Sequence, residues 1–267
     1  MQFWCSAQDT AWSWRWQAIY GVWLFIALLA FLGWRWNRAG AKRAGRAAPP
    51  LHPFFVVGLL VLWVALDWPI GALGAGYLAS VHMLQFLLIA LVAPPLLLLG
   101  TSSDAVAMVT SERSRVAALV RRLTEPFAAL VLFNIVVLVT HLPAVVDGLM
   151  TTQLGSMAID LAWLVAGLLF WWPIVHRVPE RKRFPPPLRM LYLMVGLMFS
   201  PIMFGIVGFL VYAETPLYGI YELAPPFPGF SSRDDHQLAG VTMSIGGAII
   251  AFVAISVIFF QWNKTEG

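Results

Sequence analysis

The sequence is poor in charged residues and contains a single cysteine. Charged side chains make up 11% of its 267 residues, whereas a soluble globular domain carries roughly 25%. This shortage argues against a soluble protein, and the mean hydropathy of +0.78 indicates an integral membrane protein. The single cysteine, Cys5, allows no internal disulfide. It lies apart from every motif discussed below, so we interpret it as an ordinary residue rather than as a copper or redox group.

Apolar runs long enough to cross a bilayer occupy most of the chain. About 20 apolar residues span the hydrocarbon core as a helix. Seven runs approach this length, at residues 17–34, 52–70, 76–100, 126–147, 154–175, 188–212 and 236–260. We therefore expect an all-α bundle of seven transmembrane helices, forming one integral membrane domain over residues 1–267. The first run has neither a basic leader nor a small-residue cleavage site before Arg35, so we expect a helix of the mature protein rather than a signal peptide.

The basic residues are grouped in alternate connections between these runs. Of the 17 lysine and arginine residues, 15 lie between runs one and two, three and four, or five and six, or after run seven, when Arg189, the second residue of run six, is counted with the loop before it. Because basic loops tend to stay in the cytoplasm, this pattern predicts an N-terminus outside and a C-terminus in the cytoplasm. It also accounts for the net charge of +4 without a nucleic-acid partner. The partner expected for the apolar surface is membrane lipid.

Polar residues near the outer ends of four runs fall at one predicted depth. A polar side chain kept inside a span is costly and indicates a functional site. We hypothesise a metal site at this level, with two imidazole ligands, two soft methionine candidates, and rim groups that attract or relay the ion. The imidazole ligands are His82 and His141, and the methionine candidates are Met83 and Met243. The rim groups are Asp160, Asp235, His236 and Gln237.

Copper is the metal that suits such a set, because Cu(I) in particular accepts histidine and methionine ligands. A proton path is an alternative, since perturbed histidine and aspartate titrate near physiological pH, but the polar level ends halfway across the membrane. His82 and His141 are also a candidate axial pair for haem. Retinal is disfavoured because the seventh run contains no lysine for a Schiff base.

Four stretches of the sequence resemble one protein family. They are SVHMLQFLLIALVAPPLLLLG at 80–100, THLPAVVDG at 140–148, GLLFWWPIV at 167–175 and DDHQLAGVTM at 234–243. In order and spacing they are similar to motifs of the CtaG-type, or caa-type, cytochrome c oxidase assembly factors of bacteria. The resemblance covers about residues 63–255.

This resemblance implies a multi-pass protein of the bacterial plasma membrane that assists assembly of a haem–copper cytochrome c oxidase and is not itself an enzyme. It further implies copper handling or delivery at the outer face, with oxidase subunits or other assembly factors as partners. Two alternatives stay open. One is a non-metal structural or scaffold subunit of a respiratory or other membrane complex, and the other is a small-molecule or proton carrier.

The sequence departs from the family pattern at two places. Phe86 stands where members of the family often carry a second histidine. Ser156, Ile159 and Asp160 stand where a His-x-x-Glu-His pattern is common. The resemblance therefore implies either a reduced metal site or a non-metal role. The Pro-Pro pair at 94–95 removes backbone donors, and we expect it to bend the third run below the site.

Overall fold

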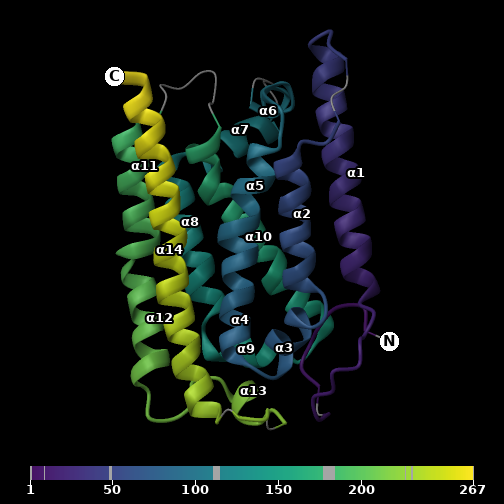
Figure 1. Ribbon diagram of the computed structural model, residues 1–267, viewed down its shortest axis with the longest axis vertical. Helices are drawn as coiled ribbons and strands as arrows, with labels where there is room; N and C mark the ends of the chain where they lie inside the picture. The colour runs from purple at the N-terminus through teal and green to yellow at the C-terminus, as the bar shows by residue number, and fades with distance from the viewer. Residues whose placement is uncertain are drawn as a thin grey trace.

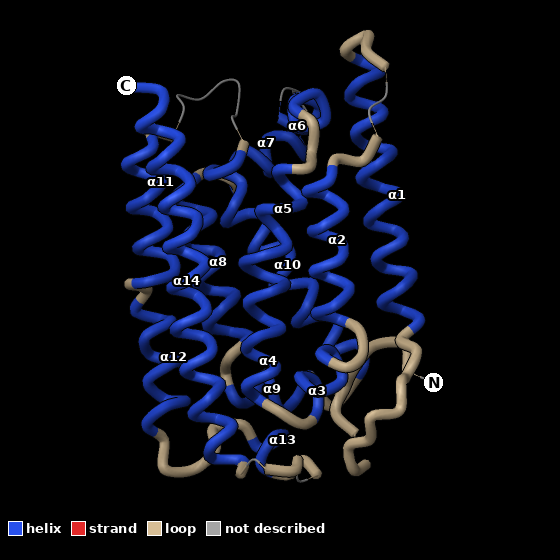
Figure 2. Tube along the Cα trace, viewed as in Figure 1, coloured by secondary structure: helices blue, strands red, loops and turns tan. Residues whose placement is uncertain are grey.

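The computed structural model describes residues 2–8, 10–47, 50–110, 115–176, 184–225, 227–229 and 231–266. Within these ranges the protein is helical, and the only extended pairing is an isolated bridge between Gln2 and Ile19. The expected all-α class is therefore confirmed. Figure 2 shows the long helices running side by side, with the loops collected at the two ends of the bundle.

The helical segments of the described ranges run along the chain from α1, near the N-terminus, to α14 at the C-terminus. They are α1 (Tyr20–Arg43), α2 (Pro53–Leu66), α3 (Ile70–Gly76), α4 (Ala79–Phe86), the π-helix η1 (Leu87–Val92), α5 (Ala93–Leu99), α6 (Ser103–Thr110), α7 (Arg115–Leu123), α8 (Pro126–Thr140), α9 (Pro143–Leu149), α10 (Gln153–Val175), α11 (Pro186–Leu193), the π-helix η2 (Met194–Met198), α12 (Pro201–Tyr212), α13 (Gly219–Glu222) and α14 (Ser232–Glu266).

Among the described residues, four helices are long and apolar enough to cross a membrane. They are Ala79–Leu99, Gln153–Val175, Pro186–Tyr212 and Ser232–Thr265. Two bent pairs would each add one span: α2 with α3, bent by 45°, and Ala117–Leu123 with α8, bent by 75°. The protein is thus a multi-pass membrane protein with four to six candidate spans. The count of seven and the orientation of the two termini stay predictions.

Several helix boundaries differ from those expected. The first helix, α1, continues to Arg43 through the stretch expected to be a linker. The run at 126–147 is broken at His141 and Leu142, because Pro143 begins a new helix and disfavours helical backbone in the residue before it. The run at 52–70 likewise ends at Leu66, and α3 begins after Pro69.

The short helices divide between the two ends of the bundle. Figure 1 places α6, α7 and the C-terminus at one end, and α3, α9, α13 and the N-terminal segment at the other. Lys42, Arg43 and Lys264, at the C-terminal ends of α1 and α14, also lie at the α6–α7 end. Several of the basic residues predicted to be cytoplasmic therefore lie at the same end of the helical bundle. Other residues of these connections lie outside the described ranges, namely Pro49, Glu112, Arg113, Ser114, Arg177, Arg181, Lys182 and Arg183.

The central span is Ala79–Leu99, of which 67% is buried, compared with 22% for α14. Its Pro-Pro pair follows the π-helix η1, and the span remains one continuous helical stretch. Pro94 has no N–H to donate to the carbonyl of Ala90 four residues earlier. The backbone of α10 comes close at this point, since a Cβ on Gly167 would overlap the Ala90 carbonyl oxygen. The span is therefore held tightly against α10.

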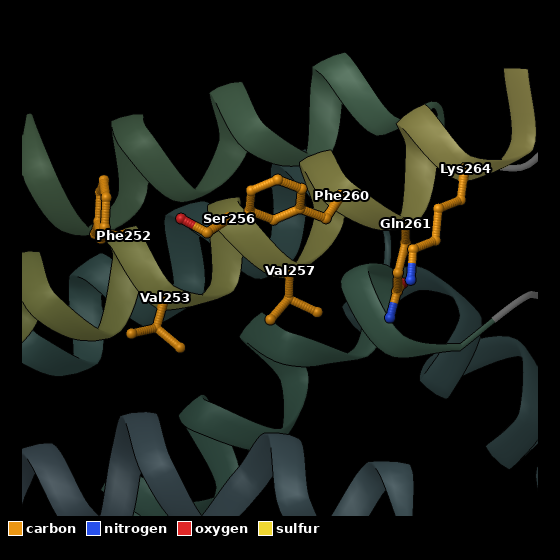
Figure 3. Close-up of a pocket in the computed structure, with 7 residues that line it drawn as sticks. All are labelled: Phe252, Val253, Ser256, Val257, Phe260, Gln261 and Lys264. Carbon is orange, nitrogen blue, oxygen red and sulfur yellow. The ribbon is translucent and has the colours of Figure 1, made fainter. Parts of the chain in front are cut away.

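The outer face of α14 is apolar and exposed along most of its length. Figure 3 shows Phe252, Val253, Val257 and Phe260 projecting from α14 around a shallow hollow, with Lys264 at its polar end. More than half of the Phe252 and Phe260 side chains is exposed. In a membrane protein such a face is suited to contact lipid tails.

Candidate functional site

The N-terminus of α4 is fixed by a carboxylate from α14. Asp235 accepts hydrogen bonds from the backbone N–H groups of Ala79 and Ser80, at 2.6 and 3.2 Å, and from the Ser80 hydroxyl at 2.5 Å. It therefore acts as the N-cap that the start of α4 lacks in its own sequence. This contact sets the position of His82, which follows within the first turn of α4.

His82 is fully buried and unpaired. Its side chain is 1% exposed, and neither ring nitrogen has a hydrogen-bond partner among the described residues. The ring packs against Trp163 of α10 and Tyr221 of α13, with centroid distances of 4.9 and 6.0 Å. Because buried polar groups are nearly always hydrogen-bonded, a wholly unpaired imidazole calls for a ligand or an ordered water.

A small cavity lies beside His82, with room for about one water molecule. Its walls come from the N-terminal segment, α3, α4, α10 and the turn that follows α9. The lining residues with polar or sulfur atoms are Cys5, His82, Gln85, Met150, Ser156 and Asp160. The hydroxyl of Ser156, like the imidazole of His82, has no hydrogen-bond partner among the described residues. Sulfur, imidazole and carboxylate groups from distant parts of the chain therefore converge at this cavity.

The N-terminal segment closes one side of this cavity. The indole N–H of Trp4 donates to Asp160 at 2.7 Å, and the backbone N–H of Phe3 donates to Gln153 at 2.8 Å. The backbone N–H of Ala7 donates to the carbonyl of Met150 at 3.0 Å. Trp4 is 1% exposed, so it is a packed core residue. These bonds place Cys5 at the cavity.

The thiol of Cys5 is buried and protonated. Its sulfur lies 3.5 Å from the carbonyl oxygen of Leu66. Burial raises the pKa of the Cys5 thiol, and the nearby carboxylates of Asp160 and Asp67 raise it further. The residue that sequence reasoning treated as ordinary thus belongs to the cavity. No sequence motif marks it, because its neighbours come from residues far along the chain.

His141 lies in the same aromatic cluster as His82. The ring of Trp163 is 4.9 Å from the ring of His82 and 5.9 Å from that of His141, and Phe86 is 5.1 Å from His141. The Nδ1–H of His141 donates to the carbonyl of Val137 at 2.7 Å, while Nε2 has no partner among the described residues. The two predicted imidazole ligands therefore lie on one indole.

Two tyrosines, Tyr218 directly before α13 and Tyr221 within it, pack at the end of this cluster. Tyr218 donates its hydroxyl hydrogen to the carbonyl of His141 at 3.1 Å, and Tyr221 donates to the carbonyl of Gly74 at 2.5 Å. Burial raises the pKa of both phenols, so both stay protonated and act as donors. The sulfur of Met150 lies 3.7 Å from the Tyr221 oxygen. Sequence analysis assigned neither tyrosine a role.

The other predicted ligands lie away from the cavity or are already hydrogen-bonded. Met83 and Met243 are buried, and neither lines the cavity. His236 donates from Nδ1 to the carbonyl of Ser232 at 2.8 Å and accepts at Nε2 from the backbone of Tyr218 at 3.2 Å. Gln237 is half-buried, outside the cavity lining. Asp235 caps α4 and is likewise absent from that lining.

Comparison with known families decides what kind of protein this is. The family model described as cytochrome c oxidase caa3 assembly factor (Caa3_CtaG) matches residues 11–265. The chain belongs to this assembly-factor family. Its membership confirms the resemblance drawn from the four sequence stretches.

The chain is also similar to two curated mycobacterial proteins. Uncharacterized protein Mb0105 of Mycobacterium bovis and Uncharacterized protein MT0111 of Mycobacterium tuberculosis are each 24% identical to it over 283 residues. Each match covers 95% of this chain and 40% of the relative. The chain therefore spans less than half the length of these relatives. No solved structure matches the chain.

The positions that the resemblance marks as departures from the family pattern lie together in space. Ser156, Ile159 and Asp160 line the cavity beside His82, and Phe86 packs on His141 and Trp163. Among the described residues, no three histidine, cysteine, aspartate or glutamate side chains lie close enough together to hold a metal ion. The cavity is therefore not a preformed three-ligand metal centre, although its walls carry donors suited to a soft cation.

Proposed function

We propose that this oxidase assembly factor holds copper for a short time at the His82 cavity, as cargo destined for a haem–copper cytochrome c oxidase. The observation that supports this most is the imidazole of His82, which is 1% exposed and has both nitrogens unpaired. Leaving a buried polar group unpaired costs about 1–3 kcal/mol. A bound cation would supply the missing partner.

The donors around the cavity favour Cu(I) over harder cations. The thioether of Met150 and the imidazole of His82 are ligands that Cu(I) accepts. Cys5 would join them as a thiolate, by releasing its proton when the cation binds. Asp160 already accepts a hydrogen bond from Trp4, so its role in the proposal is to attract the cation. Since the donors are not grouped as a finished site, side chains must rotate to bind. Weak binding of this kind suits a protein that has to release its cargo.

We propose His141 as a second, separate binding site for the copper ion. Its Nε2 has no hydrogen-bond partner among the described residues, and its ring packs on the same Trp163 indole as the ring of His82. This proposal assigns no coordinating role to the rim residues Asp235, His236 and Gln237 or to the methionine candidates Met83 and Met243. Their hydrogen bonds or their positions in the helices account for them.

The proposal places this site at the outer face of the bacterial plasma membrane. The cavity lies between the N-terminal segment and α3, at the end of the bundle opposite the basic ends of α1 and α14. The positive-inside rule assigns those basic ends to the cytoplasm. Oxidase subunits or other assembly factors would then meet the protein at its outer end. The family description indicates assistance to assembly rather than catalysis.

A Cu(I) titration of the purified protein tests the proposal. The protein in detergent competes for Cu(I) with a chromophoric chelator under anaerobic, reducing conditions. We expect about one Cu(I) per chain, and His82→Ala should lower the affinity by tenfold or more, about 1.4 kcal/mol. His176→Ala is the matched control, because His176 is also a histidine with an unpaired Nε2 but lies beyond the C-terminal end of α10. Equal affinity of both variants and wild type contradicts the proposal.

A non-metal scaffold is the second candidate. The lack of three grouped ligands among the described residues favours it. A scaffold predicts that purified protein retains no copper and that His82→Ala leaves oxidase activity and oxidase copper content unchanged in cells. The copper proposal predicts that both fall while the variant still inserts in the membrane. Oxidase activity and oxidase copper content, measured in cells that carry His82→Ala, therefore distinguish the two candidate functions.

A further inference from the structure

A large apolar groove lies between α1 and the rest of the bundle. It encloses about 640 Å³, within the range of ligand pockets. Its apolar walls come from α1, α2, α5 and α10, and include Leu29, Leu32, Phe55, Leu97, Leu168 and Trp172. It is separate from the His82 cavity, with which it shares no residue. The groove is wide enough for a flexible hydrocarbon chain.

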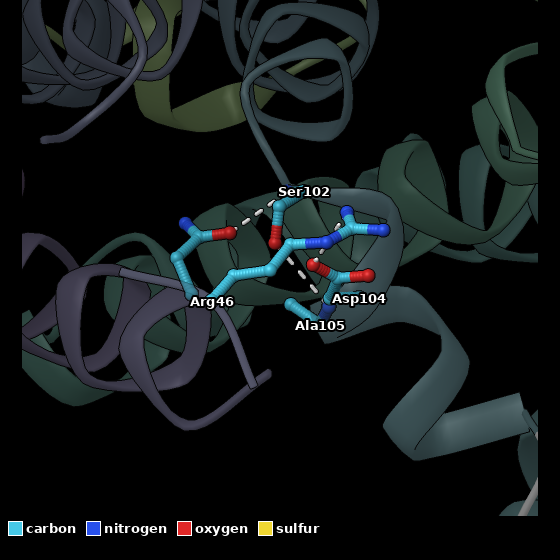
Figure 4. A network of polar contacts seen from close by, with 5 residues as sticks. Arg46, Ser102, Asp104 and Ala105 are labelled. Carbon is cyan, nitrogen blue, oxygen red and sulfur yellow. Dashed lines mark hydrogen bonds and ion pairs between the residues drawn. The ribbon is translucent and has the colours of Figure 1, made fainter. Parts of the chain in front are cut away.

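Close contacts hold α1 against the bundle along the groove. Gly33 packs on the ring of Phe55, which a Cβ would overlap. Farther along α1, the side chain of Asn37 accepts a 2.8 Å hydrogen bond from the backbone of Ser102. Figure 4 shows Ser102 near the ion pair of Arg46 and Asp104, whose atoms are 3.2 Å apart and which ties the residues that follow α1 to α6. These contacts define fixed walls around the space.

One cation at the groove has no counter-ion in the part of the chain that the structure describes. Arg35 lines the groove and is exposed. Its neighbour Arg38 lies over the ring of Trp34 at 5.2 Å, and Arg46 is paired with Asp104. No ion pair or hydrogen bond of Arg35 occurs among the described residues. The groove thus combines a long apolar wall with one free guanidinium at its rim.

We propose that the groove binds one anionic phospholipid, with an acyl chain between α1 and α10 and its phosphate on Arg35. An arginine guanidinium pairs with phosphate through two parallel hydrogen bonds. Basic residues at the cytoplasmic side of membrane helices attract anionic lipid headgroups, and the positive-inside rule assigns the Arg35 end of α1 to that side. An uncharged apolar molecule would fill the walls but leave Arg35 unpaired. This inference does not depend on copper handling.

Native mass spectrometry of the detergent-solubilised full chain tests this inference. Dioleoyl phosphatidylglycerol and dioleoyl phosphatidylcholine, which share acyl chains and differ in headgroup charge, are compared as probes. We expect the anionic lipid to bind about fivefold more tightly. Arg35→Gln should abolish this preference, whereas Arg38→Gln, the same change three residues away, should keep it. Equal binding of both lipids to wild type, or the same loss in both variants, overturns the inference.

Filling the groove tests the acyl-chain part separately. Leu168→Phe on α10 and Leu29→Phe on α1 narrow the space from opposite walls, and each should weaken binding of both lipids. Two variants are used so that one misfolded protein does not decide the result. Undiminished lipid binding by a folded variant overturns the placement of the acyl chain in the groove. Millimolar inorganic phosphate should not displace the lipid. Displacement would show that the site binds an anion alone, without an acyl chain, and would overturn the inference.

Discussion

The indole N–H of Trp4 donates a 2.7 Å hydrogen bond to the carboxylate of Asp160, which lies 156 positions further along the chain. Both residues are buried. This bond, together with those of Phe3 and Ala7, ties the N-terminal segment to α10 and to the turn after α9. Because the same segment carries Cys5, it completes the cavity beside His82.

Trp4→Phe tests the importance of this bond. The substitution keeps an aromatic ring in place but removes the N–H, so the buried Asp160 loses its donor. We expect the free energy of unfolding to fall by about 1–3 kcal/mol, measured by thermal or denaturant unfolding in detergent. Trp14→Phe is the control, because Trp14 is 66% exposed, and it should change stability by less than about 0.5 kcal/mol. Equal effects of the two substitutions would refute the assigned role.

Cys5 reports directly on whether the N-terminal segment is docked. It is the single cysteine of the chain, so maleimide labelling has one target. Burial hides the sulfur and raises its pKa, and both effects slow alkylation. We expect labelling of the folded protein to be much slower than labelling of the unfolded protein. Trp4→Phe should speed it. Rapid labelling of the folded wild type at neutral pH would show that Cys5 does not face a closed cavity.

The carboxylate of Asp235 stabilises α4 from another helix. Asp235→Ala removes the acceptor for three donors at the start of α4. The loss should cost about 2 kcal/mol or more, since a helix cap is worth about 1 kcal/mol and these donors are buried. Asp234→Ala is the neighbouring control, because Asp234 is exposed. Calorimetry or thermal unfolding compares the two, and a more damaging Asp234→Ala would contradict this assignment.

Close packing of α10 on the central span depends on Gly167. A Cβ at this position would overlap the carbonyl oxygen of Ala90, so Gly167→Ala should force the helices apart and cost about 1–3 kcal/mol. Gly148→Ala is the control, because a Cβ there meets nothing within 4 Å. The unfolding midpoints of the two variants are compared. A Gly167→Ala variant as stable as the control would mean that the helices adjust without cost.

Much of the helical framework follows from sequence because apolar length and proline positions act locally. The prediction of a span at 154–175 differs from α10 by one residue, and the span predicted at 76–100 contains Ala79–Leu99. The break at His141 and Leu142, which the predicted run at 126–147 did not include, follows from the local effect of Pro143. Pairings between distant residues carry no such local signal.

The candidate site was only partly predictable for the same reason. His82 and Asp160 stand out as polar residues within apolar runs, and both line the cavity. Asp235, which directly precedes the run at 236–260, was also predicted to serve the site but instead caps α4. Cys5 and Met150 have no signature at all, because only the tertiary fold brings them to His82. A depth along a helix is readable from sequence, whereas the face and the partner of a side chain are not.

X-ray absorption at the copper edge tests the proposed copper site most directly. The purified full chain is loaded with one equivalent of Cu(I), and the scatterers around the metal are identified. The account predicts both sulfur and imidazole nitrogen neighbours in wild type, loss of the imidazole signal in His82→Ala, and reduced sulfur scattering in Cys5→Ser. Failure to retain copper, or a spectrum that neither substitution changes, would contradict a copper site at His82.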